Sequence, residues 1–193
     1  MALQQSAQSY EDMTNLPAKL RTQLSEEHPL YVPSVLEEPF PTMAPISCSW
    51  NTTTAYALKP LPSHRATRPS YGLLLHASGC PMACAFCATG KEGLTRNLTA
   101  GEIVDQIVTV QRLMGRRVTN VVGMGQGEPL LNYDNVLGAL RIINDEKGLG
   151  IGARHICISA CGIIPGIDRF AEEPEQFTLA VSFMQHERMY ALS

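Results

Sequence analysis

The chain has 193 residues, 45% of them hydrophobic and 17% charged, so it is long enough for one globular core with an appendage and is neither disordered nor fibrous. A formal net charge of -3 excludes the global basic field that drives sequence-independent nucleic-acid binding. No apolar run approaches the roughly 20 residues of a membrane-spanning helix, and Met1 to Tyr10 do not form a secretory signal.

We therefore expect a soluble, cytoplasmic protein with no membrane partner. The polar start leaves an organelle leader, such as one for the plastid, as an alternative. Any contact with nucleic acid must be local, and the basic candidates are residues 64–68 and the pair Arg116 and Arg117. The competing interpretation of both is ordinary solvated charge in a loop or at a helix end.

The first 70 residues predict an N-terminal accessory region. Residues 11–27 predict a short helix because leucines recur there every four residues. Eight of the 13 prolines lie in residues 29–69, which opposes long helices and favours an extended linker or a small irregular subdomain. We expect residues 1–70 to form this accessory region and residues 71–193 to form the core.

Strands and helices alternate after residue 70. Apolar runs predict strands at 71–77, 118–122, 155–159 and 177–183, and amphipathic patterns predict helices at 99–114, 132–146 and 163–171. Thr99 and Glu102 have the spacing of a capping box. This alternation predicts an α/β fold with a parallel sheet and right-handed crossovers. Four strands cannot close a barrel, so we expect a sheet edge that stays open unless another segment covers it.

Three of the six cysteines are crowded into one segment directly after the first predicted strand, Cys80-Pro-Met-Ala-Cys84-Ala-Phe-Cys87. Their spacing and odd number do not suit a disulfide framework. Loops at the carboxyl ends of parallel strands hold the sites of α/β folds, so three thiolates there can converge on one metal centre. A purely electron-carrying 4Fe-4S cluster is usually held by four cysteines, so three would leave one iron open.

Two alternatives remain for these cysteines. A zinc ion completed by His76 is one, because thiolates suit both metals. Simple packing as small hydrophobic residues is the other, although cysteines in a loop would be prone to oxidation.

A second motif, Gly123-Met-Gly125-Gln-Gly127-Glu128-Pro129, follows the second predicted strand. It predicts a close-approach turn that carries one carboxylate at the same end of the sheet as the cysteines. A carboxylate there can bind an ammonium group. The alternative is a phosphate-binding loop, but Glu128 would repel phosphate and no Lys-Ser/Thr pair follows.

These segments together resemble the RlmN/Cfr-type radical S-adenosylmethionine (SAM) RNA (adenine) methyltransferases, and most of all RlmN. The residues that carry the resemblance are Gly79 to Gly90 (GCPMACAFCATG), Arg96-Asn97-Leu98 and Asn120 to Asn132 (NVVGMGQGEPLLN). The resemblance implies a radical-SAM (β/α) barrel, of which this chain holds only the N-terminal part. It also implies two cofactors, a [4Fe-4S] cluster and S-adenosyl-L-methionine.

The same resemblance assigns roles to individual residues. It implies that the cluster is ligated by Cys80, Cys84 and Cys87, with the open iron binding the amino and carboxylate groups of SAM. It implies further SAM contacts from Phe86 near the adenine, from Gly127 and Glu128 at the methionyl amine, and from Ser159 and Ser182. Without the resemblance, the two serines are simply strand residues and Phe86 fills a core.

The activity that the resemblance implies is methylation of adenine in RNA. Cleavage of SAM gives a 5′-deoxyadenosyl radical, which takes a hydrogen from a methyl group carried on a cysteine near the C-terminus. The methyl carbon then adds to C2 of adenine in RlmN-like enzymes, in large-subunit ribosomal RNA and some transfer RNAs, or to C8 in Cfr-like ones. The implied partners are RNA and an electron donor such as flavodoxin or ferredoxin.

The sequence departs from this pattern in several places, two of which concern the catalytic cysteines. The methyl-carrying cysteine of the family falls beyond residue 193, and Leu73 stands where the family has its second catalytic cysteine, seven residues before Cys80. We therefore expect an incomplete member that does not methylate RNA by itself. The alternative is a [4Fe-4S]- and SAM-binding module without methyl transfer. We assign no role to Cys48, Cys157 or Cys161, and for the last two we favour a buried structural position.

Overall fold

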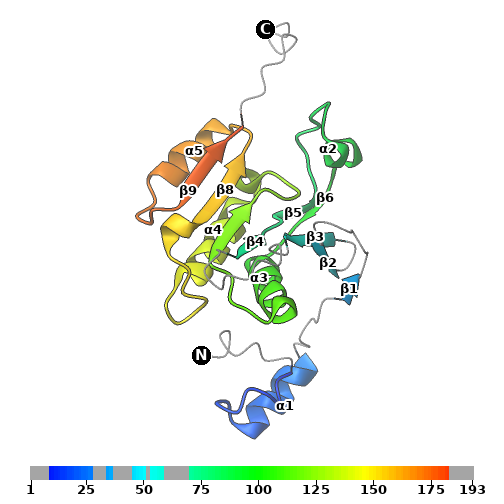
Figure 1. The fold of residues 1–193 in the computed structure, drawn as a ribbon, viewed down its shortest axis with the longest axis vertical. Helices are drawn as coiled ribbons and strands as arrows, with labels where there is room; N and C mark the ends of the chain where they lie inside the picture. The colour runs from blue at the N-terminus through cyan, green and yellow to red at the C-terminus, as the bar shows by residue number, and fades with distance from the viewer. Residues whose placement is uncertain (1–8, 28–33, 37–44, 51–52, 59–69, 183–193) are drawn as a thin grey trace, which may run out of the picture.

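The computed structural model describes residues 9–27, 34–36, 45–50, 53–58 and 70–182. Its centre is a four-stranded parallel sheet with the strand order β4-β7-β8-β9 (Figure 1). These strands are β4 (Tyr71–Leu73), β7 (Asn120–Gly123), β8 (Ile156–Ala160) and β9 (Thr178–Val181). The predicted α/β fold with a parallel sheet is confirmed, and the sheet has the strand order of a partial barrel.

Each crossover between neighbouring strands of this sheet contains a helix. The helices are α3 (Ala100–Met114), α4 (Tyr133–Asn144) and α5 (Ile164–Ala171), with short 3-10 turns η2 (Pro129–Asn132) and η3 (Ala153–His155). Each of the three helices begins one residue after its predicted start. The capping box is present, because Thr99 Oγ1 accepts the Glu102 N–H at 3.3 Å and a Glu102 carboxylate oxygen accepts the Thr99 N–H at 2.9 Å.

The hydrophobic core lies between the sheet and helices α3 and α4. On β8 the burial alternates, with Ile156, Ile158 and Ala160 facing the core and Cys157 and Ser159 on the less buried face. The fully buried side chains from the other elements include Ile103, Ile107, Val121, Leu140 and Ile143. One face of the sheet therefore packs against the helices, and the other face remains available for a site.

The strand predicted at 71–77 is wrong in its extent. β4 ends at Leu73, the chain bends, and Ala77–Gly79 forms β5, which pairs antiparallel with β6 (Leu94–Asn97) outside the main sheet. Gln106 on α3 holds the bend: its Oε1 accepts the Leu75 N–H at 2.8 Å and its Nε2 donates to the Leu75 carbonyl at 3.1 Å. The buried amide thus takes the place of a neighbouring strand and satisfies both backbone groups.

The β5–β6 pair and α2 (Ala88–Glu92) extend from the end of the sheet toward which the arrows of β8 and β9 point (Figure 1). This is the carboxyl end of the parallel strands. Loops at this end carry the sites of α/β folds, so the bend after β4 delivers the segment that follows β5 to the functional edge.

The N-terminal part is more regular than the prolines suggest. Instead of an extended linker or an irregular subdomain, an antiparallel sheet of order β1-β2-β3 is present, formed by β1 (Ser34–Leu36), β2 (Pro45–Trp50) and β3 (Thr53–Leu58). Pro45 is the first residue of β2, where a missing N–H is tolerated. Helix α1 spans Ala18–Glu27 and begins later than the predicted residue 11. The division into two domains near residue 70 stays a prediction.

In the part of the chain that the structure describes, the helices are too short or too polar to cross a membrane.

Candidate cluster and cofactor site

The three clustered cysteines lie in one loop between β5 and α2. The Cys80 N–H donates to the Gly93 carbonyl at 2.9 Å, and the Cys87 N–H donates to the Cys84 carbonyl at 3.0 Å. Gly79, just before the loop, has a φ of +80°, and a Cβ there would lie 2.0 Å from the Gly93 oxygen. Only glycine fits this position, and it brings the two ends of the cysteine loop together.

Cys80, Cys84 and Cys87 are free and half-buried. Among the described residues, no three His, Cys, Asp or Glu side chains converge closely enough to hold a metal ion. His76 therefore does not complete a zinc site with these cysteines in the described arrangement. The structure brings the three cysteines into one loop and leaves their thiols apart, so ligation of a cluster by these residues stays a prediction. The donor set itself fits a [4Fe-4S] cluster, because three accessible thiols of one short loop are the ligands that such clusters use.

The glycine-rich turn after β7 packs against the bend that leads to the cysteines. The Gln126 carbonyl accepts the N–H groups of His76 and Ala77 at 3.0 and 3.3 Å. Gly127 has a φ of +94°, and a Cβ there would lie 2.8 Å from the Ala77 Cβ. The turn and the start of β5 are therefore in direct contact, as the sequence predicted when it put both motifs at one end of the sheet.

Glu128 is 5% exposed and already holds two backbone groups. One oxygen, Oε1, accepts the Leu130 N–H at 3.1 Å at the start of η2, and Oε2 accepts the Cys161 N–H at 2.8 Å just after β8. The carboxylate thus ties the turn to the end of β8. Its oxygens have further acceptor capacity, but its predicted contact with an amine stays a prediction.

Ser159 and Ser182, which come from neighbouring strand ends, are brought together. Their Oγ atoms are 3.5 Å apart, and the Ser182 N–H donates to the Ala160 carbonyl at 2.9 Å. Both belong to the side of the sheet opposite the packed helices. The pair is a polar element beside the glycine-rich turn, and its contact with SAM stays a prediction.

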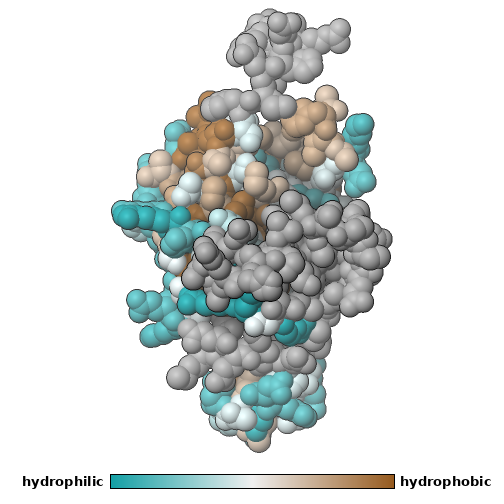
Figure 2. Space-filling model, viewed as in Figure 1, coloured by the Kyte–Doolittle hydropathy of each residue, from teal (hydrophilic) through white to brown (hydrophobic). Residues whose placement is uncertain are grey.

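Phe86 is 66% exposed, so it does not fill a core. Other large apolar side chains are also exposed after the strands, namely Met124 in the turn after β7, Leu131 in η2 and Ile164 at the start of α5. Figure 2 shows hydrophobic surface at the upper end of the view, over α5 and around α2. An exposed aromatic ring at this edge can stack on a purine, which is consistent with the predicted place of Phe86 near an adenine.

Two residues of the motif segments position the site and were not assigned from the sequence. Asn132 Nδ2 donates to the carbonyls of His76 and Leu98, both at 2.8 Å, and so joins β5 and β6 to the start of α4. Arg96 forms a two-armed ion pair with Glu102, at 2.7 and 3.0 Å. Both lie in segments that carry the family resemblance. The role of Asn132 depends on partners 34 and 56 residues away, whereas the partner of Arg96 is six residues away.

The structure describes only one of the two basic segments that were considered for contact with nucleic acid. Arg117 donates to the carbonyls of Leu149 and Gly150, at 2.9 and 2.6 Å, so it holds a loop together. Residues 64–68 lie outside the described residues.

Cys157 and Cys161 are half-buried rather than fully buried. Burial raises the pKa of Cys161 to about 12, together with a hydrogen bond from its thiol to Glu128, the charge of Glu128 and the charge of Cys84. Burial also raises the pKa of Cys157. Both thiols therefore carry their protons at neutral pH.

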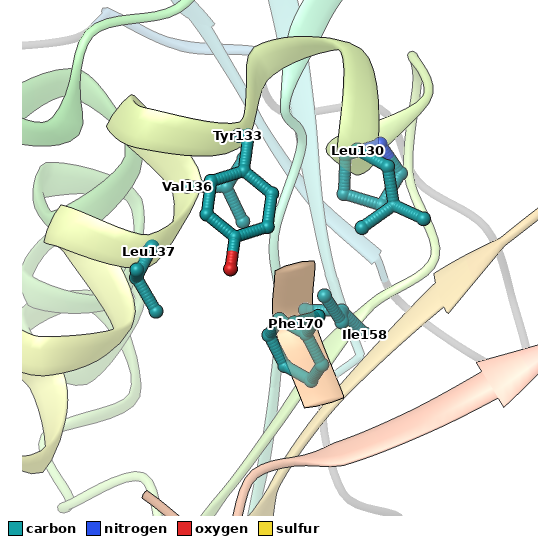
Figure 3. A pocket seen from close by; sticks show the side chains of 7 residues that line it. Leu130, Tyr133, Val136, Leu137, Ile158 and Phe170 are labelled. Carbon is teal, nitrogen blue, oxygen red and sulfur yellow. The ribbon is translucent and has the colours of Figure 1, made fainter. Parts of the chain in front are cut away.

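A small apolar space lies between η2, α4, β8 and α5 (Figure 3). Its lining includes Leu130, Ile158, Tyr133 and Phe170. The rings of Tyr133 and Phe170 meet edge to face, with centroids 6.5 Å apart. The space leaves no room for a water molecule. It is packed core that supports the Glu128 turn, and it holds no substrate.

His76 is a buried imidazole with no hydrogen-bond partner in the described part of the chain on either ring nitrogen. Its side chain packs against β7, where a Cβ on Gly123 would lie 2.6 Å from its Nε2. Burial lowers the pKa of His76 from 6.5 to about 4, so the ring is neutral at pH 7.

This lowered pKa predicts a loss of stability in mild acid. Between pH 6.5 and 4, His76 binds a proton in the unfolded chain but stays neutral in the folded chain. Folding therefore becomes less favourable as the pH falls. At pH 5 the cost is about 2 kcal/mol, and at pH 7 it nearly vanishes. We expect the H76L variant to gain about this much over the wild type at pH 5, relative to their difference at pH 7, in urea unfolding.

The wild type has to be compared with the H76L variant because Asp105 changes the pH dependence of stability in the opposite direction. Burial raises the pKa of Asp105 to about 6, so its proton uptake favours the folded chain over much of the same range. Asp105 is present in both proteins and cancels in the difference. Equal pH dependence of the two proteins would show that His76 is not the group responsible.

Comparison with known proteins identifies relatives of this arrangement. The model of the Radical SAM superfamily matches residues 74–184. Proteins named probable dual-specificity RNA methyltransferase RlmN, from Symbiobacterium thermophilum and Bacillus thuringiensis, are each 43% identical and align with 93% and 90% of this chain. The chain spans about half the length of these curated relatives, 49% in both cases.

A solved structure agrees with the sequence comparison. The crystal structure of a radical SAM methyltransferase from Sphaerobacter thermophilus matches with a TM-score of 0.78 and 36% identity, over 93% of this chain and 54% of that one. The predicted resemblance to RlmN is therefore confirmed, and with it the cofactors that this family uses, a [4Fe-4S] cluster and SAM. Because the family model covers more than half of it, the chain belongs to the radical SAM superfamily.

Proposed function

We propose that this chain binds a [4Fe-4S] cluster and SAM and serves in the methylation of adenine at C2 in RNA. The observation that carries the proposal is the contact between two motifs: the Gly127 turn packs on Ala77, at the start of the strand that leads directly to Cys80. Cys80, Cys84 and Cys87 would hold the cluster, which supplies the electron for SAM cleavage when it is bound.

The other described residues have supporting roles in this proposal. Gly127 lets the backbone of the turn approach closely, and Glu128 offers its remaining lone pairs to the methionyl amine of SAM. The Ser159–Ser182 pair offers hydroxyl groups on the open face of the sheet. Phe86 offers an exposed ring for the adenine of SAM.

The proposed partners are RNA and an electron donor such as flavodoxin or ferredoxin, and the proposed location is the cytoplasm. The RNA is a large-subunit ribosomal RNA, with transfer RNA as a second substrate. The names of the relatives, which are dual-specificity RNA methyltransferases, support an RNA partner. The free thiols described in the chain suit a reducing compartment.

A second candidate function is a cluster- and SAM-binding module without methyl transfer. Leu73 favours it, because the last residue of β4 stands where the family has its second catalytic cysteine. A leucine side chain has no thiol with which to form or break a covalent bond to a methylated product.

One anaerobic experiment tests the proposal and separates the two candidates. The reconstituted chain is incubated with SAM, a reductant and ribosomal RNA, and both 5′-deoxyadenosine and 2-methyladenine are measured. For this chain by itself we expect 5′-deoxyadenosine without 2-methyladenine, which supports the proposal, whereas a bound cluster with neither product supports the binding module. Formation of 2-methyladenine would refute the expectation that the chain is an incomplete member. Colourless protein with stoichiometric zinc and no SAM cleavage would refute both.

A further inference from the structure

Asn132 is a buried amide at the end of η2, and its side chain bonds to two other segments of the chain. Only 4% of the residue is exposed. Its Nδ2 donates to the carbonyls of His76 and Leu98, both at 2.8 Å, and its Oδ1 accepts a hydrogen bond from Asn135 Nδ2 at 2.8 Å. The contact with Asn135 fixes the orientation of the amide, because an oxygen in place of Nδ2 could not bond to the two carbonyls.

The two carbonyls lie at the base of the hairpin that carries the cysteine loop. His76 directly precedes β5 and Leu98 directly follows β6, and the Leu98 N–H donates to the His76 carbonyl at 3.1 Å. The cysteine loop lies between these two strands. The Gln126 carbonyl already holds the β5 side to the glycine-rich turn, so Asn132 adds a connection to the β6 side.

The other end of η2 carries the proposed SAM contact. Glu128 directly precedes η2, and its carboxylate accepts the N–H groups of Leu130 and Cys161. Between the two ends, Leu130 packs into the apolar space of Figure 3, which leaves no room for water, and a Cβ on Gly166 of α5 would lie 2.7 Å from the Leu130 Cβ. A short turn packed this tightly keeps Glu128 and Asn132 at a fixed separation.

We propose that Asn132 is a positioning residue, which sets the place of the cysteine loop relative to the Glu128 turn. This inference rests on the proposed function, which assigns the loop to the cluster and the turn to SAM. Both cofactors then depend on η2, because the segments that would hold them are attached to its two ends. Loss of the Asn132 amide frees the β6 side of the hairpin and leaves the side chains of the proposed cofactor contacts unchanged.

The test uses the full chain as wild type, N132D, N132A and I143V. N132D keeps the size of the side chain but replaces the amide donor with a carboxylate that only accepts, and N132A removes the whole group. I143V is the control, because Ile143 is fully buried in the last turn of α4, at the opposite end of that helix from η2. It shows how a general loss of core packing affects the same measurements.

The first measurement is hydrogen exchange in the metal-free chain. We expect peptides that cover β5 and β6 to exchange about tenfold faster in both Asn132 variants, relative to peptides of β7 and β8 in the same protein. In I143V this ratio should equal that of the wild type, because the loss of packing affects the whole core.

The second measurement is the dissociation constant of SAM for the chain reconstituted anaerobically with iron and sulfide. The Asn132 variants should take up as much iron as the wild type and bind SAM about tenfold more weakly, whereas I143V should bind it like the wild type. Relative to the wild type, N132D should recover part of its affinity as the pH falls from 8 to 6. A protonated carboxyl group can donate one of the lost hydrogen bonds, so N132A should show no such recovery.

Two results would overturn the inference while the proposed function stands. Equal exchange ratios in N132D and the wild type would show that Asn132 does not hold the hairpin. Faster exchange of the hairpin with unchanged SAM affinity would show that the contact is structural only. If the wild-type chain takes up no iron and binds no SAM, the proposed function fails and the inference fails with it.

Discussion

A chain in which Cys80, Cys84 and Cys87 are all replaced by alanine is expected to take up no cluster, whereas the wild type takes up about four irons. The physical reason is the donor set: these thiols come from one half-buried loop between β5 and α2, and they supply all the protein ligands of the proposed site. Iron and sulfide analysis after anaerobic reconstitution measures the result, and the brown absorption of the cluster should vanish with the iron.

The matched control for this triple variant is C157S. Cys157 is also half-buried and free, but it lies within β8 instead of the cysteine loop. It should keep the full iron content. If the triple variant retained as much iron as C157S, other residues would have to hold the cluster, and the assignment of the loop would be wrong.

The parts of the fold that depend on local signals were predictable. The start of α3 follows from the reciprocal hydrogen bonds of Thr99 and Glu102, which lie three residues apart and need no tertiary partner. The strand order follows from the regular alternation of apolar runs and amphipathic helices, since each crossover places the next parallel strand beside the last.

The bend after β4 was not predictable in the same way. The apolar run continues through residues 74 and 75, so the sequence predicts a single strand across the bend. What ends the strand is Gln106, which lies 31 residues later and bonds to both backbone groups of Leu75. Similarly, the β1–β3 sheet is held together by pairing between strands, and the number of prolines in a segment does not predict such pairing.

The candidate site shows the same limit. The sequence identified the cysteine loop and the glycine-rich turn and put them at one end of the sheet, and the contact of Gly127 with Ala77 confirms it. It did not identify the hydrogen bond that the Cys161 N–H donates to the Glu128 carboxylate, whose partners are 33 residues apart. A carboxylate in a motif suggests a ligand, but a buried carboxylate also needs donors from its own chain, and those are set by the tertiary fold.

The second large effect is expected from G127A. The residue has a φ of +94°, which a side chain rarely adopts, and the added methyl would lie 2.8 Å from the Ala77 Cβ. Backbone strain of about 1–2 kcal/mol and overpacking of a further 1–3 kcal/mol together predict a loss of about 3 kcal/mol in the free energy of unfolding. Urea unfolding at pH 7.5 measures it.

The G115A variant shows how much stability is lost through backbone strain alone, without the clash that G127A adds. Gly115 also has a positive φ, +59°, but a Cβ there would meet nothing within 4 Å, so only about 1 kcal/mol should be lost. G127A should also weaken SAM binding, because a turn pushed away from Ala77 moves Glu128 and the base of the cysteine loop together, whereas G115A at the end of α3 should leave it unchanged. Equal losses of stability in the two variants, with SAM binding intact in both, would mean that the Gly127 turn does not support the site.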